Sequence, residues 1–418
     1  MQMKNPPKRN IILISHDILR KDSLGVYSGK SNTPNIDKVS SEGTTFYNYY
    51  AGGGSTAMAF TTMFTGLNPN EVKGRAYYKE VKTFDQSETM FQKFQHHGYD
   101  SHVIWPKHFD RYVEQYLRIF NKDVNVHSLS SVSTLIPTTK DWSSYKELEK
   151  IDGVSHGAII YLNKIRDILK YNTNPVFIWA HFPHLLSPYK SYGQDIYEFD
   201  KFIGELSSEF DIDLFITADH GQMCGEKGLH FYGSWVYEGI VNIPLITPRL
   251  SIGPRVEFPV GANQLMDIVI DRIVDRREFI YSDTRYYKQP DRVVMIRSNN
   301  YKYIYNKRKG TEELYDLTFD PNENLNLLRQ YYYSPERHLF YPYKELFHYE
   351  FWEQAEEYYV KLKKEKNRIW RTGNYFDIIV RRLYQVYNIF SISSIKNRIK
   401  VRTKLKGKSL GRWGAKVV

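Results

Sequence analysis

Short apolar runs alternate along this chain with segments of helical spacing. Each run is rich in β-branched residues and continuously apolar, which is typical of strands buried on both faces. The clearest runs are residues 10–15, 101–105, 175–180, 213–218 and 243–246. Segments with helical spacing lie at residues 36–43, 89–98, 157–169, 197–210 and 264–274. This alternation predicts an α/β fold with a mostly parallel central sheet flanked by helices.

The pattern changes in the last third of the chain. Short segments there alternate between apolar and polar residues and are separated by turns, at residues 292–297, 301–305 and 313–317. They predict a small antiparallel sheet. We therefore expect a catalytic α/β domain, a small antiparallel subdomain and a helical, basic extension, at residues 1–285, 286–330 and 331–418.

Positive charge is concentrated in the C-terminal extension. The formal net charge is +11, but residues 361–418 alone carry +15, which leaves −4 for residues 1–360. A mildly acidic body argues against a nucleic-acid-binding core. Residues 344–369 are expected to form a helix, and residues 375–390 show an apolar stripe with basic edges. A helix packed on the body is the favoured interpretation; peripheral contact with anionic lipid is the alternative.

Cysteine content and hydropathy bear on the compartment. Cys224 is the only cysteine in the sequence, so no internal disulfide can form. The N-terminal residues lack the apolar core of a signal peptide. No stretch approaches the roughly 20 apolar residues that cross a bilayer. We expect a cytoplasmic protein, with the basic extension as the part that could contact the inner membrane face.

Three of the expected strands end in residues fit for chemistry. Asp17 follows the first run, His181 follows the run at 175–180, and Asp219-His220 follow the run at 213–218. The carboxyl ends of parallel strands meet at one edge of a sheet, where ligands bind. Carboxylate and imidazole groups suit a hard or borderline divalent cation. A helix cap or a core histidine would explain each residue alone, but together they predict a metal site.

The candidate nucleophile lies within residues 51–66. Gly52, Gly53 and Gly54 allow a tight turn, and a helix is expected from residue 57, with Ser55 or Thr56 at its start. A hydroxyl there lies beside free backbone N–H groups and the positive end of the helix dipole, which stabilise an anion. Taken alone, an ordinary Ser/Thr cap explains this segment better.

Motifs around these residues resemble the sulfatase family of the alkaline phosphatase superfamily. They are Asp17-Ile-Leu-Arg20-Lys-Asp-Ser-Leu-Gly25-Val-Tyr27, Thr33-Pro-Asn-Ile-Asp37, Thr65-Gly66, Asp219-His220-Gly221, Tyr301-Lys302-Tyr-Ile304 and Glu313-Leu-Tyr-Asp-Leu317. They follow the family's order over residues 10–328. The resemblance implies an alkaline-phosphatase-like fold. It also implies a hydrolase or transferase acting on a small-molecule, lipid or polysaccharide ester of phosphate or sulfate.

The resemblance also implies roles for individual residues. The metal ligands would be Asp17, Thr56, Asp219 and His220. They would hold one divalent ion: Ca²⁺, Mn²⁺, Mg²⁺ or Zn²⁺. Thr56 would attack the ester. The histidine that protonates the leaving group is left open among His181, His184 and His230. The residues predicted to contact substrate are Arg20, Ser55 and Lys302.

The nucleophile motif departs from that of the family. Sulfatases carry Cys/Ser-x-Pro-x-Arg, whose first residue is oxidised to formylglycine, whereas this chain has Thr56-Ala-Met-Ala-Phe60. A plain threonine resembles the branch that transfers phosphoethanolamine or phosphoglycerol, or cleaves phosphodiesters. Ile18 stands where the family has a second Asp. The alternatives are a conventional sulfatase (a sulfuric ester hydrolase) and an inactive sulfatase-like binding protein in surface-polysaccharide assembly.

Overall fold

The computed structural model describes most of the catalytic region and parts of the C-terminal region. The described residues are 8–29, 32–72, 88–109, 124–129, 156–183, 192–284, 292–329, 331–334, 339–342 and 349–371. The chain divides into a large unit, Met1–Leu362, and a small unit, Lys363–Val418. Of the small unit, only the end of one helix is among the described residues. The predicted boundaries at residues 285 and 330 stay predictions.

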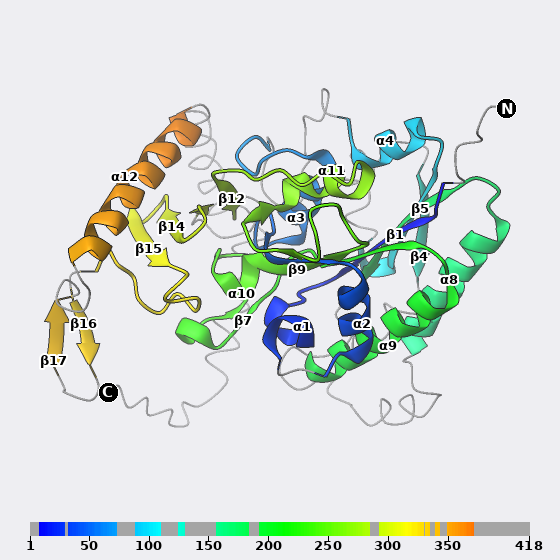
Figure 1. The fold of residues 1–418 in the computed structure, drawn as a ribbon, viewed down its shortest axis with the longest axis horizontal. Helices are drawn as coiled ribbons and strands as arrows, with labels where there is room; N and C mark the ends of the chain where they lie inside the picture. The colour runs from blue at the N-terminus through cyan, green and yellow to red at the C-terminus, as the bar shows by residue number, and fades with distance from the viewer. Residues whose placement is uncertain are drawn as a thin grey trace, which may run out of the picture. The chain divides into compact units, whose positions relative to one another are not determined.

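A nine-stranded sheet forms the centre of the large unit (Figure 1). Its strands are β1 (Ile11–His16), β2 (Thr44–Tyr50), β3 (Asp100–Pro106), β4 (Asn125–Leu129), β5 (Val176–Phe182), β6 (Asp213–Ala218), β9 (Asn242–Thr247), β10 (Arg255–Val256) and β11 (Val260–Gly261). Their order is β10-β2-β9-β6-β1-β5-β3-β4, with β11 also paired to β2. All pairings are parallel except those of β9, which runs antiparallel to β2 and β6. The predicted mostly parallel sheet is confirmed.

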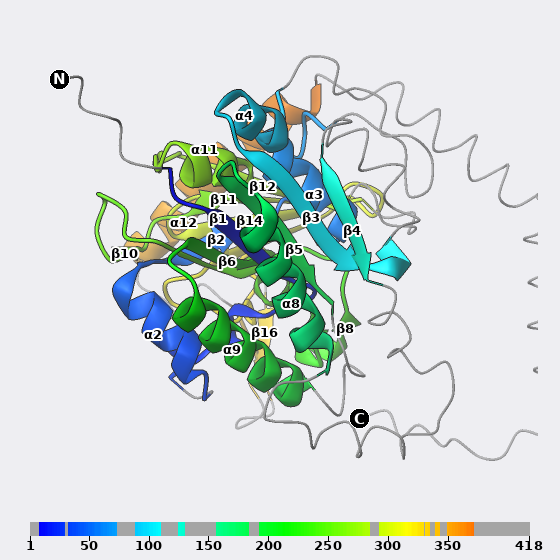
Figure 2. The same ribbon diagram turned by 90° about the vertical axis from the view of Figure 1, so that its right-hand side faces the viewer.

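Helices cover both faces of this sheet (Figures 1 and 2). One face carries α1 (Gly25–Ser28), α2 (Pro34–Glu42), α8 (His156–Tyr171) and α9 (Tyr192–Glu209). The other carries α3 (Thr56–Thr65), α4 (Met90–His96) and α11 (Leu265–Ile270). Helix α4 begins at a capping box between Thr89 and Gln92. Helix α3 ends at Gly66, which takes the left-handed conformation (φ 69°) common after a helix.

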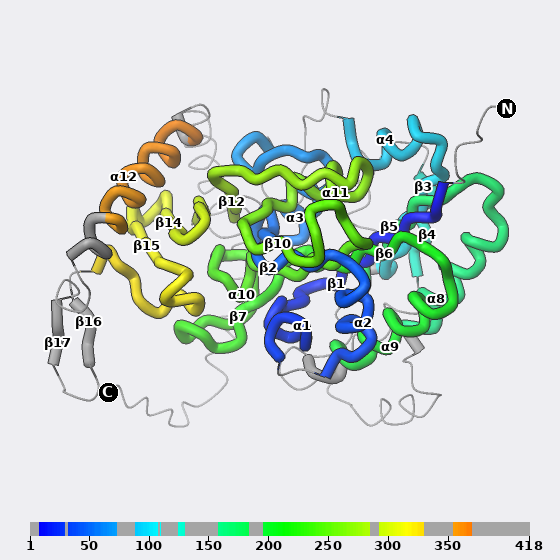
Figure 3. Tube along the Cα trace, in the orientation of Figure 1, coloured from blue at the N-terminus to red at the C-terminus, as the bar shows by residue number. Residues whose placement is uncertain are grey.

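The main core lies between the sheet and these helices. Strands β1 and β5 are buried along their whole length, and β1 pairs with β5 on one side and with β6 on the other. Figure 3 shows these strands between α4 and the pair α8 and α9. Phe60 of α3 packs edge-on against Trp179 of β5, with ring centroids 4.7 Å apart. Each fully buried Ile, Leu or Phe contributes about 1.5–3 kcal/mol to folding. The sheet therefore gives a rigid base to the groups at its carboxyl edge.

The predicted antiparallel sheet is also confirmed. It contains β12 (Ile280–Asp283), β13 (Val293–Arg297), β14 (Tyr301–Asn306) and β15 (Thr311–Asp316). One face packs against Tyr50 and the short helix α10 (Glu238–Val241). The other face packs against α12 (Tyr349–Arg371), whose Tyr358 and Tyr359 contact the rings of Tyr301 and Tyr303 in β14.

Two small strand pairs complete the described structure. They are β7 (Met223–Cys224) with β8 (His230–Phe231), and β16 (Tyr331–Ser334) with β17 (Leu339–Pro342). None of the described helices is long and apolar enough to span a bilayer. Helix α12 confirms the helix expected near residues 344–369. The amphipathic segment 375–390 lies outside the described residues.

Candidate active site

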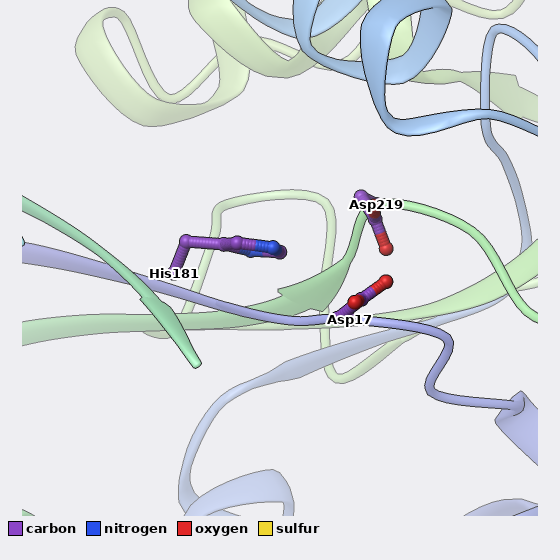
Figure 4. Close-up of side chains that lie close together, drawn as sticks. All are labelled: Asp17, His181 and Asp219. Carbon is purple, nitrogen blue, oxygen red and sulfur yellow. The ribbon is translucent and has the colours of Figure 1, made fainter. Parts of the chain in front are cut away.

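The carboxyl ends of three adjacent strands meet as the sequence predicts. Asp17 follows β1, His181 lies in β5, and Asp219 follows β6. The backbone N–H of Asp17 donates to the carbonyl of Phe182 at 2.9 Å, which extends the β1–β5 pairing to the site. One ligand atom from each of Asp17, His181 and Asp219 lies within 4.8 Å of the others. In Figure 4 the two carboxylates face each other and the imidazole points toward them.

Asp219 is the most constrained of these groups. Its side chain is fully buried, and its Oδ1 accepts hydrogen bonds from the backbone N–H groups of His220 (2.8 Å) and Ile18 (3.2 Å). Burial raises the pKa of Asp219 to about 7. A buried carboxylate beside a second one is costly unless a cation neutralises both. Two carboxylates at this spacing therefore fit a divalent metal ion.

His220 faces the candidate nucleophile. Its Nδ1 lies 3.0 Å from the carbonyl oxygen of Gly221. A carbonyl only accepts, so Nδ1 carries the proton of the neutral ring. Its Nε2 lies 3.3 Å from Oγ1 of Thr56 and 3.3 Å from Oδ2 of Asp219. Burial lowers the pKa of His220. The lone pair on Nε2 is therefore available to accept from Thr56 or to bind a metal ion.

Thr56 is the first residue of α3, and Ser55 is the cap before it. Thr56 is half-buried, whereas Ser55 is buried and its hydroxyl has no hydrogen-bond partner among the described residues. The preceding glycines are sterically required. A Cβ at Gly52 would lie 2.2 Å from Oγ1 of Thr62, and one at Gly53 would lie 2.3 Å from a backbone oxygen. The turn thus delivers two hydroxyls to the N-terminus of a ten-residue helix.

Ile18 is a feature that the sequence did not reveal. It is buried and takes a left-handed conformation, with φ of 54°. A β-branched residue rarely takes this conformation, because its side chain crowds the backbone. The conformation directs the N–H of Ile18 onto Asp219. From the sequence alone, position 18 indicated only that the second Asp of the family motif is absent.

Arg20 holds the loop that follows His220. Its Nη1 donates to the carbonyl of Gln222 at 2.9 Å and lies 2.7 Å from Glu226, while its Nε donates to Asp22 at 2.8 Å. These contacts give Arg20 a structural role. Its predicted contact with substrate stays a prediction.

Lys302 of β14 is fully buried between two carboxylates. Its Nζ lies 2.8 Å from Glu238 and 2.8 Å from Glu323. Burial raises the pKa of Glu323 to about 7. Burial also acts on Glu238, but Lys302 and Arg297 outweigh it and hold the pKa of Glu238 at about 2. This cluster joins the antiparallel sheet to α10, so the predicted substrate contact of Lys302 stays a prediction.

His230 and His184 are the other two histidine candidates. His230 lies in β8, opposite Cys224 across the β7–β8 pair, and is exposed. His184 lies outside the described residues. Their role as proton donors stays a prediction.

Comparison with known proteins shows the family and the fold of this chain. A model of the sulfatase family matches residues 9–248. The chain is 21% identical over 446 residues to an arylsulfatase of Clostridium perfringens (strain 13 / Type A), covering 78% of this chain and 92% of that protein. It is similar in structure to a 2-O GAG sulfatase, with a TM-score of 0.60, 18% identity, and coverage of 87% of this chain and 92% of that chain. It is also similar to the phosphonate monoester hydrolase of Agrobacterium radiobacter, with a TM-score of 0.60, 15% identity, and coverage of 87% and 96%. These structural similarities confirm the predicted fold.

Proposed function

Because the chain belongs to the sulfatase family, whose model matches more than half of it, we propose that it is a metal-dependent hydrolase or transferase of a phosphate or sulfate ester, with Thr56 as nucleophile. The observation that carries the proposal is the 3.3 Å contact between Oγ1 of Thr56 and Nε2 of His220. That contact lies beside two facing carboxylates and at the start of a helix. A nucleophile next to an oriented acceptor is the arrangement that covalent catalysis needs.

Asp17, Asp219 and His220 are the residues that would hold a divalent ion. With the ion bound, Nε2 of His220 would direct its lone pair to the ion instead of accepting from Thr56. The ion would lower the pKa of the Thr56 hydroxyl and neutralise charge on the ester. The raised pKa of Asp219, which burial causes, supports this assignment, because the carboxylate is costly to ionise without a cation.

The chain's own residues account for attack and for anion binding. The Thr56 hydroxyl gives up its proton to solvent, Oγ1 attacks phosphorus or sulfur, and the bond to the leaving oxygen breaks as that oxygen takes up a proton. The free N–H groups at the start of α3 bind the non-bridging oxygens of the ester. The buried hydroxyl of Ser55 is placed to donate to the same oxygens. Water or an alcohol then releases the group from Thr56, which gives a hydrolase or a transferase.

Residues 56–60 favour a phosphorus ester. A threonine cannot supply the aldehyde of formylglycine, so the sulfatase reaction through that group is not available to Thr56. The similar phosphonate monoester hydrolase supports an ester of phosphorus on this fold. The similar 2-O GAG sulfatase supports a saccharide carrier and keeps a conventional sulfatase as the second candidate. A lipid carrier and an inactive binding protein are weaker alternatives.

A paired turnover assay tests the proposal. The metal-reconstituted protein is given an aryl phosphodiester and an aryl sulfate, with Thr56→Ala as the blank and Thr56→Ser as the matched control that keeps the hydroxyl. We expect turnover of the phosphodiester. We expect the kcat of Thr56→Ala to fall by about 10³-fold or more, because the variant lacks the attacking oxygen. We expect Thr56→Ser to retain part of the activity. Preference for the sulfate would favour the second candidate. Undiminished turnover by Thr56→Ala would overturn the nucleophile assignment.

A further inference from the structure

A buried hydrogen-bonded chain links β1 to the histidine of β5. Ser15 and His181 are partners in the β1–β5 register, so their side chains lie on the same face of the sheet. Oγ of Ser15 lies 2.9 Å from Nδ1 of His181 and 2.8 Å from Nε1 of Trp179. All three side chains are fully buried. Water therefore does not compete for these hydrogen bonds.

The chemistry of the three groups fixes where the protons lie. The indole N–H of Trp179 only donates, so Oγ of Ser15 accepts from it. Among the described residues, the acceptor that the Ser15 hydroxyl contacts is Nδ1 of His181. If Nδ1 carried a proton, the hydroxyl would be left without an acceptor in a fully buried place, which is unfavourable. Nδ1 therefore accepts, and the proton of the neutral ring lies on Nε2.

Aromatic rings hold the imidazole in this orientation. The rings of Phe60 and Phe109 meet that of His181 nearly at right angles, with centroids 4.9 Å away in both pairs. The hydroxyl of Tyr161 donates to the backbone oxygen of His181 at 2.6 Å. Phe60 lies one turn after Thr56 on α3, so both project from the same side of that helix. Phe60 thus links the His181 ring to the helix that carries Thr56.

The second nitrogen of the ring faces the reaction site. Nδ1 of His181 is hydrogen-bonded to Ser15, so Nε2 is the ring nitrogen that remains for the side of Asp17 and Asp219. Figure 4 shows the imidazole pointing toward these two carboxylates. His220 has the opposite arrangement, with the proton on Nδ1 and the lone pair on Nε2. The site therefore holds one imidazole that accepts and one that donates.

We propose that Ser15 is a positioning residue that keeps His181 as a neutral Nε2–H donor to an oxygen of the bound ester, and that His181 is not a metal ligand. This inference rests on the proposed function, because the oxygen belongs to the ester attacked by Thr56. A fixed donor aimed at an oxygen that gains negative charge stabilises the transition state. No proton is transferred by His181, so His184 and His230 remain the candidates for protonating the leaving group.

Nitrogen NMR of the protein with ¹⁵N-labelled histidine tests the tautomer directly. The spectrum is recorded for the metal-free protein and after addition of Zn²⁺, and the His181 signals are assigned by their loss in His181→Gln. We expect a protonated Nε2 and an unprotonated Nδ1 in both samples. A protonated Nδ1, or loss of the Nε2 proton when Zn²⁺ binds, would overturn the proposal.

Two variants separate positioning from general loss of structure. Ser15→Ala removes the hydroxyl, and we expect a mixed tautomer and a kcat about 10–100-fold lower on the aryl phosphodiester, by analogy with residues that orient a metal-bound histidine. Ser15→Thr keeps the hydroxyl on a strand that tolerates β-branching, and we expect it to restore the wild-type spectrum and rate. A wild-type spectrum for Ser15→Ala would also refute the proposal.

The nitrogen spectrum is recorded without substrate, so the proposed function and the role of Ser15 can be refuted independently of each other. The expected tautomer in a protein that turns over neither ester would refute the proposed function and leave the role of Ser15 in setting the tautomer intact. A protonated Nδ1 in an active enzyme would refute only the role of Ser15.

Discussion

Oγ1 of Thr56 lies 3.3 Å from Nε2 of His220, and the two residues come from different elements of the fold. Thr56 begins α3, whereas His220 follows the end of β6. The helix brings the attacking group and the sheet brings the acceptor. Because both are fixed by the core, the pair is preorganised before substrate binds.

This pairing predicts different losses for its two members. Thr56→Ala should abolish turnover but leave much of the metal bound, because Asp17, Asp219 and His220 remain. His220→Ala should weaken both metal binding and turnover. Metal content after dialysis, measured beside turnover of the aryl phosphodiester, distinguishes them. Equal metal loss in both variants would mean that Thr56 is an essential ligand.

The buried carboxyl of Asp219 predicts a pH dependence for the metal-free protein. Its pKa is raised from 3.8 to about 7 in the folded protein. The stability that the protonated group contributes is therefore complete below about pH 4 and is lost as the pH rises through about 7. Between pH 5 and pH 8 the expected loss is on the order of 2–3 kcal/mol, because part of the contribution has already gone at pH 5. Urea unfolding at these two pH values measures the loss.

Asp219→Asn is the matched control for this pH dependence. The amide does not ionise, so we expect the metal-free variant to lose less stability between pH 5 and pH 8 than the wild type. The same variant should fail to bind metal and should be inactive. An equal loss of stability in both proteins would show that another group titrates.

The ion pairs of two lysines predict losses of different size in the free energy of unfolding when each lysine is replaced. Lys302→Met leaves Glu238 and Glu323 buried without their cation, and we expect a loss of about 3–5 kcal/mol in the free energy of unfolding. Lys361→Met is the control, because the Lys361–Glu278 pair is roughly half exposed and surface pairs contribute about 0–1 kcal/mol. Denaturant unfolding of the two variants gives the comparison. Similar small losses would contradict the structural role assigned to Lys302.

Removal of residues 372–418 tests the last part of the basic extension; residues 372–418 lie outside the described residues. We expect the shortened protein to keep its activity on a small aryl phosphodiester, since none of the site residues is removed. If the extension contacts lipid, binding to vesicles containing anionic lipid should be lost, and co-sedimentation measures it. Failure of the shortened protein to fold would favour a helix packed on the body.

The sequence predicted the parts of the fold that depend on hydrophobic pattern. The runs at residues 10–15 and 213–218 became β1 and β6, because continuous apolarity suits strands covered on both faces. The strands that the sequence missed have another composition. β2 mixes aromatic residues with Thr44, Thr45 and Asn48, and its pairing with β9 shifts register between Phe46 and Tyr49. The antiparallel direction of β9 was also missed, since apolarity does not encode direction.

The candidate site shows the same division. The arrival of Asp17, His181 and Asp219 at one edge could be predicted from strand ends alone. Two other contacts could not. The Ser15–His181 contact depends on which strands are neighbours and in what register. The ion pairs of Lys302 depend on which way a β14 side chain points. A motif identifies a residue, but tertiary packing decides its contacts.

The left-handed backbone at Ile18 also bears on how this site tolerates mutation. The donor to Asp219 there is a main-chain N–H, which every amino acid except proline supplies. Substitution at position 18 can therefore change what fills the space below the site while the hydrogen bond survives. Glycine or asparagine would adopt the conformation with less strain. We therefore expect the orientation of the Asp219 carboxylate to tolerate any substitution at position 18 except proline.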